Sequence, residues 1–162
     1  MASGDTLAVF TPLHNETPTS NGATLDTRNA HPVLDFYDGT NESAVFSAIM
    51  PQAYDGGGVT VYLHWSAIAT SGDVDWDVAW ERIGDQQLDV DGDSFAAVNS
   101  QDNNTVPATS GLVDVISVAF TNGADMDSVA VGELFRLKVT RDASSDTATG
   151  DAELHAVELR ET

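Results

Sequence analysis

Two segments in which apolar and polar residues strictly alternate constrain the fold more than any other feature of the chain. In residues 59–66 the apolar series ends at Trp65, and in residues 74–81 it includes Trp76 and Trp80. A period of two is typical of a β-strand with one buried and one solvated face, whereas a helix would scatter these side chains around its circumference. Since a Thr-Ser-Gly-Asp turn separates the segments, we predict the central hairpin of an all-β domain, with the three tryptophans in its core.

Shorter apolar or alternating runs, separated by turn-forming residues, flank this hairpin on both sides. We predict further strands at 31–37, 44–50, 94–98, 112–120, 133–141 and 151–160. In 133–141 the alternation places Phe135, Leu137 and Val139 inward, and on the opposite face Leu134, Arg136, Lys138 and Thr140. Residues 101–111 are expected to be a loop, and the strand at 112–120 is apolar enough to be buried on both faces. About eight regularly spaced strands predict an antiparallel β-sandwich of the jelly-roll type. A slip in the alternation near residues 156–157 predicts a bulge in the last strand.

Residues 1–30 differ in composition from the remainder of the chain. Threonine, serine, asparagine, proline and glycine dominate, and Pro12 and Pro18 interrupt regular structure. The segment is either a frayed terminus or an extended arm that pairs with a sheet edge or packs into a groove of a neighbour. We predict an extended N-terminal arm at 1–30 and a β-sandwich domain at 31–162. The arm is favoured by an apolar tetrad that would make its contacts: Leu7, Ala8, Val9 and Phe10.

The charge balance excludes several classes of partner. The 162 residues include 26 acidic and only 6 basic side chains, a formal net charge of −20. Six cations cannot build the basic patch that phosphate neutralisation requires, so we expect no nucleic-acid partner and no membrane partner. Such a surface repels its own copies, so an oligomer requires apolar contacts, salt or bound cations. The absence of a signal-peptide pattern predicts synthesis in the cytoplasm.

Candidate metal-binding patterns fail on their spacing. The chain has no cysteine, which excludes thiol nucleophiles and thiolate sites. Residues 89–93 place aspartates at the first, third and fifth positions of a calcium loop, but Ser94 and Ser100 stand where glycine and glutamate are required. This leaves an Asx-rich turn or a weak, partly hydrated cation site. We predict no metal site and no cofactor, since the four histidines also lack ligand spacing: His14, His31, His64 and His155.

Asp73, Asp75 and Asp77 share one face of a predicted strand. Alternate strand positions lie about 6.5–7 Å apart, and paired carboxylates at such a separation could serve glycoside hydrolysis. Nothing in the sequence separates their pKa values, so a solvated outer face is favoured and we expect no enzyme. The tryptophans could likewise form a sugar-stacking platform, but their alternation with Val74 and Val78 favours core packing.

Five segments together resemble a group of virion proteins. They are TLDTRNAHPVLDF (24–36), AYDGGGVTVYLHWSA (53–67), DVDWDVAWERIGD (73–85), GELFRLKVTRD (132–142) and GDAELHAVELRET (150–162). This combination resembles the jelly-roll decoration (head-stabilising, cement) proteins of tailed bacteriophages, from residue 24 onward. The resemblance implies a non-enzymatic virion protein that binds the major capsid protein on the outer capsid surface as a homotrimer, with the N-terminal arm reaching neighbouring subunits. Related sequences also resemble modules of phage tail or fibre proteins.

Two functions of different classes follow from these observations. The first is a capsid decoration protein, made in the host cytoplasm, that docks through residues 1–30. The second is a carbohydrate- or receptor-binding module of a tail or fibre structure, which requires exposed aromatic side chains. For the second function the candidate aromatics are Trp65, Trp76 and Trp80, which the first function assigns to the core scaffold. A small hydrolase built on the three aspartates is the least favoured interpretation.

Overall fold

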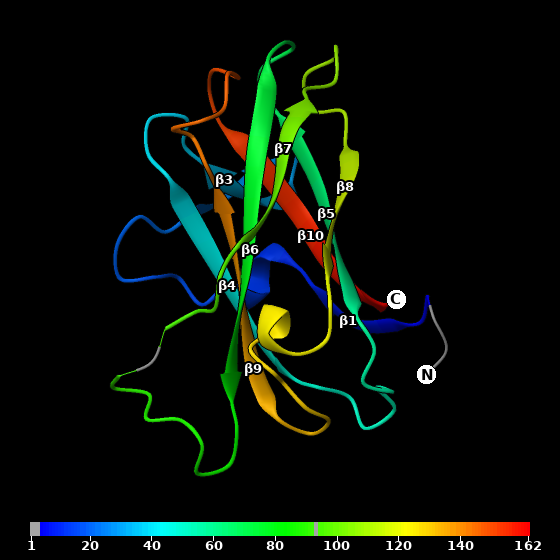
Figure 1. Ribbon diagram of the computed structural model, residues 1–162. Coiled ribbons are helices and arrows are strands. Elements are labelled where there is room, and N and C mark those ends of the chain that lie inside the picture. The colour runs from blue at the N-terminus through cyan, green and yellow to red at the C-terminus, as the bar shows by residue number, and fades with distance from the viewer. Residues whose placement is uncertain (1–3, 93) are drawn as a thin grey trace.

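Two antiparallel sheets pack face to face in the computed structural model, which describes residues 4–92 and 94–162 (Figure 1). Six strands form one sheet in the order β2-β3-β10-β5-β8, with β1 also paired to β10, and four form the other in the order β4-β9-β6-β7. The predicted all-β sandwich is confirmed, with ten strands instead of about eight. The strands are β1 Thr6–Phe10, β2 Thr24–Arg28, β3 His31–Phe36, β4 Glu42–Ile49, β5 Val59–Ala67, β6 Asp73–Ile83, β7 Asn99–Thr105, β8 Asp114–Phe120, β9 Leu134–Arg141 and β10 Ala152–Glu161.

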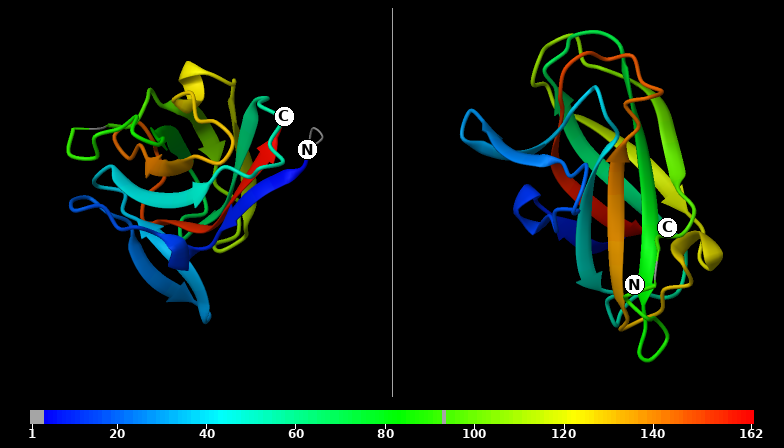
Figure 2. Two further views of the ribbon diagram at one scale, coloured as in Figure 1. Left: turned by 90° about the horizontal axis from the view of Figure 1, so that it is seen from below. Right: turned by 90° about the vertical axis from the view of Figure 1, so that its left-hand side faces the viewer.

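Helical structure in the described residues is limited to two short 3-10 turns, η1 (Pro12–His14) and η2 (Ala124–Met126). Neither turn has the length or the apolar composition to cross a membrane. The first and last strands, β1 and β10, lie side by side (Figure 2). There the N–H of Gly4 donates to the carbonyl of Glu161 at 2.6 Å.

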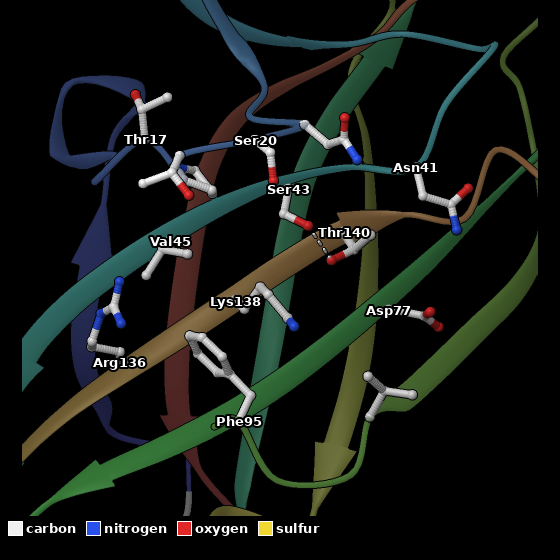
Figure 3. A pocket seen from close by; sticks show the side chains of 14 residues that line it. Thr17, Ser20, Asn41, Ser43, Val45, Asp77, Phe95, Arg136, Lys138 and Thr140 are labelled. Atoms are coloured by element: carbon white, nitrogen blue, oxygen red, sulfur yellow. Dashed lines mark hydrogen bonds between the residues drawn. The ribbon is translucent and has the colours of Figure 1, made fainter. Parts of the chain in front are cut away.

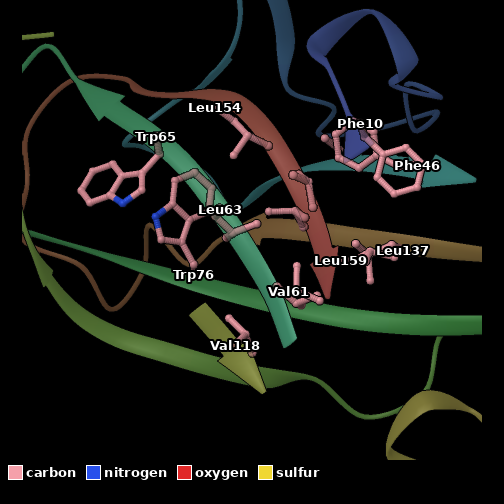
Figure 4. Packing of buried hydrophobic residues seen from close by; sticks show 14 of the residues in the cluster. Phe10, Phe46, Val61, Leu63, Trp65, Trp76, Val118, Leu137, Leu154 and Leu159 are labelled. Carbon is pink, nitrogen blue, oxygen red and sulfur yellow. The ribbon is translucent and has the colours of Figure 1, made fainter. Parts of the chain in front are cut away.

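The predicted central hairpin is wrong, because its two strands belong to different sheets. β5 pairs with β8 and β10, whereas β6 pairs with β7 and β9. The residues between them, 68–72, therefore cross from one sheet to the other. The two apolar stripes face each other across the core, and the rings of Trp65 and Trp76 meet edge to face with 6.0 Å between centroids (Figure 4). A period of two identifies the buried face of a strand but leaves its pairing partner undetermined.

All three tryptophans lie in the hydrophobic cluster between the sheets, with no exposed surface. Trp80 packs against Phe120 and Phe135, at centroid distances of 6.0 and 4.9 Å. None of the three indole N–H groups has a hydrogen-bond partner among the described residues, so the tryptophans contribute apolar packing alone. They therefore leave no tryptophan ring at the surface for a sugar to stack on.

The strands β1 and β2 are part of the six-stranded sheet and do not extend from it as the predicted arm. β10 pairs with β3 only along residues 152–154. On that side of β10, the residues after 154 are not paired with β3. β1 fills this edge, and the ring of Phe10 stacks on Phe46 with 5.3 Å between centroids. β2 then pairs with β3. Residues on both sides of position 31 thus belong to one sheet.

Some strand limits differ from the predicted ones. β7 lies largely inside a segment predicted as a loop, because its polar residues pair with the edge of β6 and add little to the core. Residues 94–98 form no strand. β8 is an edge strand that alternates instead of being buried on both faces, and Val115 is 47% exposed. A register shift between Leu154 and Ala156 confirms the predicted bulge.

Candidate functional site

A groove of about 620 Å³ lies on the outer face of the four-stranded sheet (Figure 3). The strands β4, β9 and β6 form its floor, which includes Ser43, Lys138 and Asp77. Two loops that are distant in the sequence form its walls. One consists of residues 17–21 beside β4, and the other is the segment around Phe95 beside β6.

Strand alternation determines which side chains reach the floor of the groove. In β9, every second residue from Phe135 to Val139 is fully buried in the core. Arg136, Lys138 and Thr140 therefore face outward, as the sequence predicts, and line the groove. Because β9 is flanked by β4 and β6, these three side chains form the central strip of the floor.

Phe95 supplies the aromatic part of one wall. Its loop is attached to the edge of β6 by a hydrogen bond of 2.8 Å from the N–H of Ala96 to the carbonyl of Trp80. The ring centroid lies 4.6 Å from the Lys138 ammonium nitrogen and 5.5 Å from the Arg136 guanidinium carbon. Two cations thus pack against the ring. The segment was predicted as a strand, and a lone aromatic residue in a polar, turn-rich sequence is the signal that could have identified it.

Hydrogen bonds to β4 hold the opposite wall in place. The N–H of Glu16 donates to the carbonyl of Val45 at 2.7 Å, and the Val45 N–H donates to the Asn15 side chain at 3.0 Å. Farther along, the N–H of Ser43 donates to the carbonyl of Asn21 at 2.8 Å. A segment predicted as part of an extended arm therefore runs along the edge of β4 and encloses the groove.

The charged side chains of the groove differ in how they are paired. The Arg136 guanidinium donates to Glu81 at 3.0 Å and to Glu16 at 3.3 Å, so two carboxylates offset its charge. The carboxylate of Asp77 accepts a hydrogen bond from the hydroxyl of a β7 serine. Lys138 is the only lysine of the sequence, and its ammonium has no hydrogen bond or ion pair with another described residue.

The three aspartates of β6 do not form a common site. Asp77 lines the groove, whereas Asp73 accepts a hydrogen bond from Thr105 at 2.8 Å at the end of the strand. The prediction that all three aspartates are solvated is wrong for Asp75. This residue is buried because the backbone of Asn103 lies over it. Burial raises the pKa of the Asp75 carboxyl, although the Asn103 N–H donates to it at 2.6 Å.

The calcium-like segment forms a turn in its described part. The N–H of Asp91 donates to the Asp89 carboxylate at 3.1 Å, and the N–H of Gly92 donates to the Asp89 carbonyl at 2.9 Å. Asp93, the last aspartate of the pattern, lies outside the described residues. Within 4–92 and 94–162, no group of three or more histidine, cysteine, aspartate or glutamate side chains is arranged to hold a metal.

Three histidines that are far apart in the sequence lie near one another on the outer face of the six-stranded sheet. His31 and His155 line two adjacent hollows of about 340 and 400 Å³. The Nε2 atom of His155 is hydrogen-bonded to the Ser66 hydroxyl at 2.8 Å, and this hydroxyl donates to Glu153 at 2.6 Å. Burial lowers the pKa of His155; the carboxylate of Glu153 opposes this shift and nearby His64 adds to it.

The apolar tetrad predicted to make contacts lies in β1 and does not line the groove. Leu7 and Phe10 are buried in the core, and Ala8 packs partly against it. Val9 is 54% exposed. The fourth histidine, His14, accepts a hydrogen bond from the backbone just after β1 at 2.9 Å.

Comparisons with known proteins identify the fold. Scans against protein-family models and curated proteins gave no match. A family 35 carbohydrate binding module from an environmental isolate matches with a TM-score of 0.56 at 12% identity, over 96% of this chain and 94% of that chain. The C-terminal CBM6 of LamC, a marine laminarinase from Zobellia galactanivorans, matches with a TM-score of 0.50 at 9% identity, over 97% and 100% of the two chains.

A third match is the insecticidal delta-endotoxin Cry8Ea1 from Bacillus thuringiensis. It has a TM-score of 0.54 at 13% identity and covers 99% of this chain but only 25% of that chain. These structures confirm the predicted jelly-roll sandwich, and at such low identities they show the fold alone. They support the jelly-roll part of the resemblance and give no support to its phage decoration part.

Proposed function

We propose that this protein is a saccharide-binding β-sandwich module, without catalytic activity, whose ligand binds in the groove over β4, β9 and β6. The observation that carries the proposal is a hollow with one aromatic wall and a lining rich in hydroxyl and amide groups. Its volume of about 620 Å³ falls in the range of small-ligand sites, about 300–1,000 Å³. A sugar ring has an apolar C–H face and a rim of hydroxyls, so it complements such a surface.

The polar side chains of the groove match the needs of a sugar rim. The hydroxyls of Ser43 and Thr140 bond each other at 2.7 Å, which leaves further donor and acceptor capacity on each oxygen. Asn21 lines the same hollow, and an amide side chain both donates and accepts. The amide of Asn41, which also lines it, already donates to Asp142 and accepts from the N–H of Ser144. The partly exposed ring of Phe95 supplies the apolar surface that none of the buried tryptophans can supply.

The small number of carboxyl groups in the groove favours ligand binding over hydrolysis. Glycoside hydrolysis uses two carboxyl groups on opposite sides of the scissile bond. Among the described residues that line the groove, Asp77 is the only one with a carboxyl group. The other two aspartates of the strand have their own hydrogen-bond partners outside the groove. A single carboxylate can accept hydrogen bonds from sugar hydroxyls.

The structural neighbours support the same proposal. Two of the matched structures are carbohydrate-binding modules by name, and each covers nearly the whole of this chain. A shared fold does not transfer a ligand, so the proposal depends on the groove and the neighbours only add to it. These observations thus favour the predicted carbohydrate-binding alternative, with Phe95 instead of the tryptophans as the aromatic contact.

The capsid role remains a prediction, including the outer capsid surface, the major capsid protein and two further copies of the chain as partners. It would need the tetrad at residues 7–10 to contact other proteins. Leu7 and Phe10 are already buried in this chain's own core, so most of that apolar surface is used within the domain.

A glycan array tests the proposed function. The wild-type protein should bind a subset of oligosaccharides, and Phe95→Ala should weaken that binding about tenfold because the apolar contact is lost. Tyr37→Ala is the matched control, since Tyr37 is 54% exposed and lies outside the groove. Equal binding by Phe95→Ala and the wild type, or no binding to any saccharide, would overturn the proposal.

A further inference from the structure

Lys138 is the one cation without a carboxylate partner in the part of the chain that the structure describes. Every arginine forms an ion pair, with the shortest N–O distance of each between 2.5 and 3.0 Å. The pairs are Arg28–Glu153, Arg82–Glu133, Arg136–Glu81, Arg141–Asp146 and Arg160–Glu158. The sequence has 26 acidic and 6 basic side chains, so carboxylates are abundant, and an ammonium without one requires a local explanation.

The explanation is the position of Lys138 in the middle of the groove floor (Figure 3). Its cross-strand neighbours are Val45 on β4 and Ala79 on β6, and neither side chain offers a charge or a hydrogen-bond acceptor. The ring of Phe95 lies 4.6 Å from the ammonium nitrogen. Attraction to the ring leaves the positive charge and the three N–H donors of the ammonium in place.

The other charged groups of the groove do not compensate this cation. Arg136, two residues earlier on the same strand, is itself held by Glu81 and Glu16. Asp77 lies opposite Thr140 in the strand register, and it is not within ion-pair distance of the lysine. A neutral ligand that covered the lysine would remove water from an unpaired charge, which is unfavourable. An anionic ligand would replace that water with an ion-pair partner for the ammonium.

We propose that the groove selects saccharides that carry an anionic group, either a carboxylate or a sulfate ester, and that Lys138 binds this group. The inference rests on the proposed saccharide-binding function and names its ligand class. A hydrogen bond between an ammonium and an anionic oxygen is roughly twice as strong as one between neutral groups. The net charge of −20 repels such a ligand elsewhere, so binding concentrates at the uncompensated lysine.

The test is an array in which each oligosaccharide backbone appears in neutral, carboxylated and sulfated forms. At least one anionic form should bind the wild-type protein about tenfold more tightly than the neutral form of the same backbone. Lys138→Gln keeps a polar side chain and removes the charge, so it should reduce this preference to less than about twofold. Arg160→Gln is the matched control, because it removes one positive charge above Tyr62 on the other sheet and should keep the preference.

The outcomes separate this inference from the proposed function. A preference for either anionic form supports the inference and identifies the anion. Neutral forms that bind equally well or better overturn the inference and leave the proposed function standing. Binding to no form overturns both. A preference that survives in Lys138→Gln overturns the role assigned to the lysine.

Discussion

The outer faces of the two sheets differ in how their charged side chains are partnered. On the six-stranded sheet, Arg28 donates to Glu153 at 2.5 Å, and Glu153 also accepts from Ser66, which is hydrogen-bonded to His155. On the four-stranded sheet, Lys138 stands in a groove without a carboxylate partner among the described residues. The first arrangement stabilises the fold and needs nothing further. The second leaves a charge for which the described residues supply no counterpart, and in this respect the proposed binding surface differs from the structural one.

The largest expected change in stability comes from a substitution in residues 6–28. This segment contributes to both sheets, since it forms two strands of the six-stranded sheet and a wall of the groove on the four-stranded one. Phe10→Ala removes a buried ring that stacks on Phe46 and should lower the free energy of unfolding by about 4 kcal/mol. Urea unfolding followed by tryptophan fluorescence measures the change. Leu13→Ala, at a site 69% exposed, should cost less than about 0.5 kcal/mol. Equal costs would mean that the segment is a separate arm after all.

The next effect compares a paired cation with the unpaired one. Arg28→Ala leaves the carboxylate of Glu153, which is 5% exposed, without its ion pair, and should cost about 3 kcal/mol of unfolding free energy. Lys138→Ala breaks no ion pair and should cost less than about 0.5 kcal/mol. Chemical denaturation of both variants at neutral pH gives the two values. If the lysine variant lost as much stability as the arginine variant, the contrast between the two faces would be incorrect.

A pH experiment examines the crowding of acids on the six-stranded face. Burial, followed by the charges of Asp151, Glu153 and Asp26, raises the pKa of Asp35 from 3.8 to about 6. The folded state therefore binds this proton more tightly than the unfolded state does. The resulting stabilisation is complete below pH 3.8 and is lost as the pH rises through about 6.

Asp35→Asn removes this titration. It should raise the free energy of unfolding at pH 7 by about 1 kcal/mol and reduce its slope between pH 4 and 7. Unfolding curves at several pH values measure both effects, with Lys138→Gln as a control that keeps the wild-type slope. A variant that is less stable than the wild type at pH 7 would contradict the assignment.

A small effect on stability is expected at the groove wall. Phe95 is only partly buried, so Phe95→Ala should change the unfolding free energy by less than about 1 kcal/mol. The same variant should lose most of its saccharide binding, so stability and binding separate. Thermal unfolding and the array, applied to one preparation, check this separation. A large loss of stability together with retained binding would show that the ring is a core residue.

The sequence predicted the layers of the fold better than its connections. Alternation identified the buried faces of β5, β6 and β9, because burial imposes a period of two on each strand. It could not show that β5 and β6 lie in opposite sheets, since two apolar stripes can lie side by side or face each other. β7 was missed because its polar residues form an edge strand through backbone hydrogen bonds, which leave little trace in composition.

The candidate site was predicted only in part. The outward positions of Arg136, Lys138 and Thr140 followed from the alternation of β9. Phe95 and the wall at residues 17–21 did not follow, because loops are placed by hydrogen bonds to distant strands that no local pattern encodes. The absence of a carboxylate partner for Lys138 depends on the positions of every acidic side chain near it. Composition alone cannot show it, since acids outnumber cations by 26 to 6.

The most direct test of the central claim is an NMR titration of the isotopically labelled full chain with the saccharide that binds most tightly on the array. We expect the largest amide shift changes at residues 41–45, 94–98 and 136–140, around the groove. Shift changes concentrated around His31 and His155, in the hollows of the other sheet, with the groove amides unchanged, would contradict it.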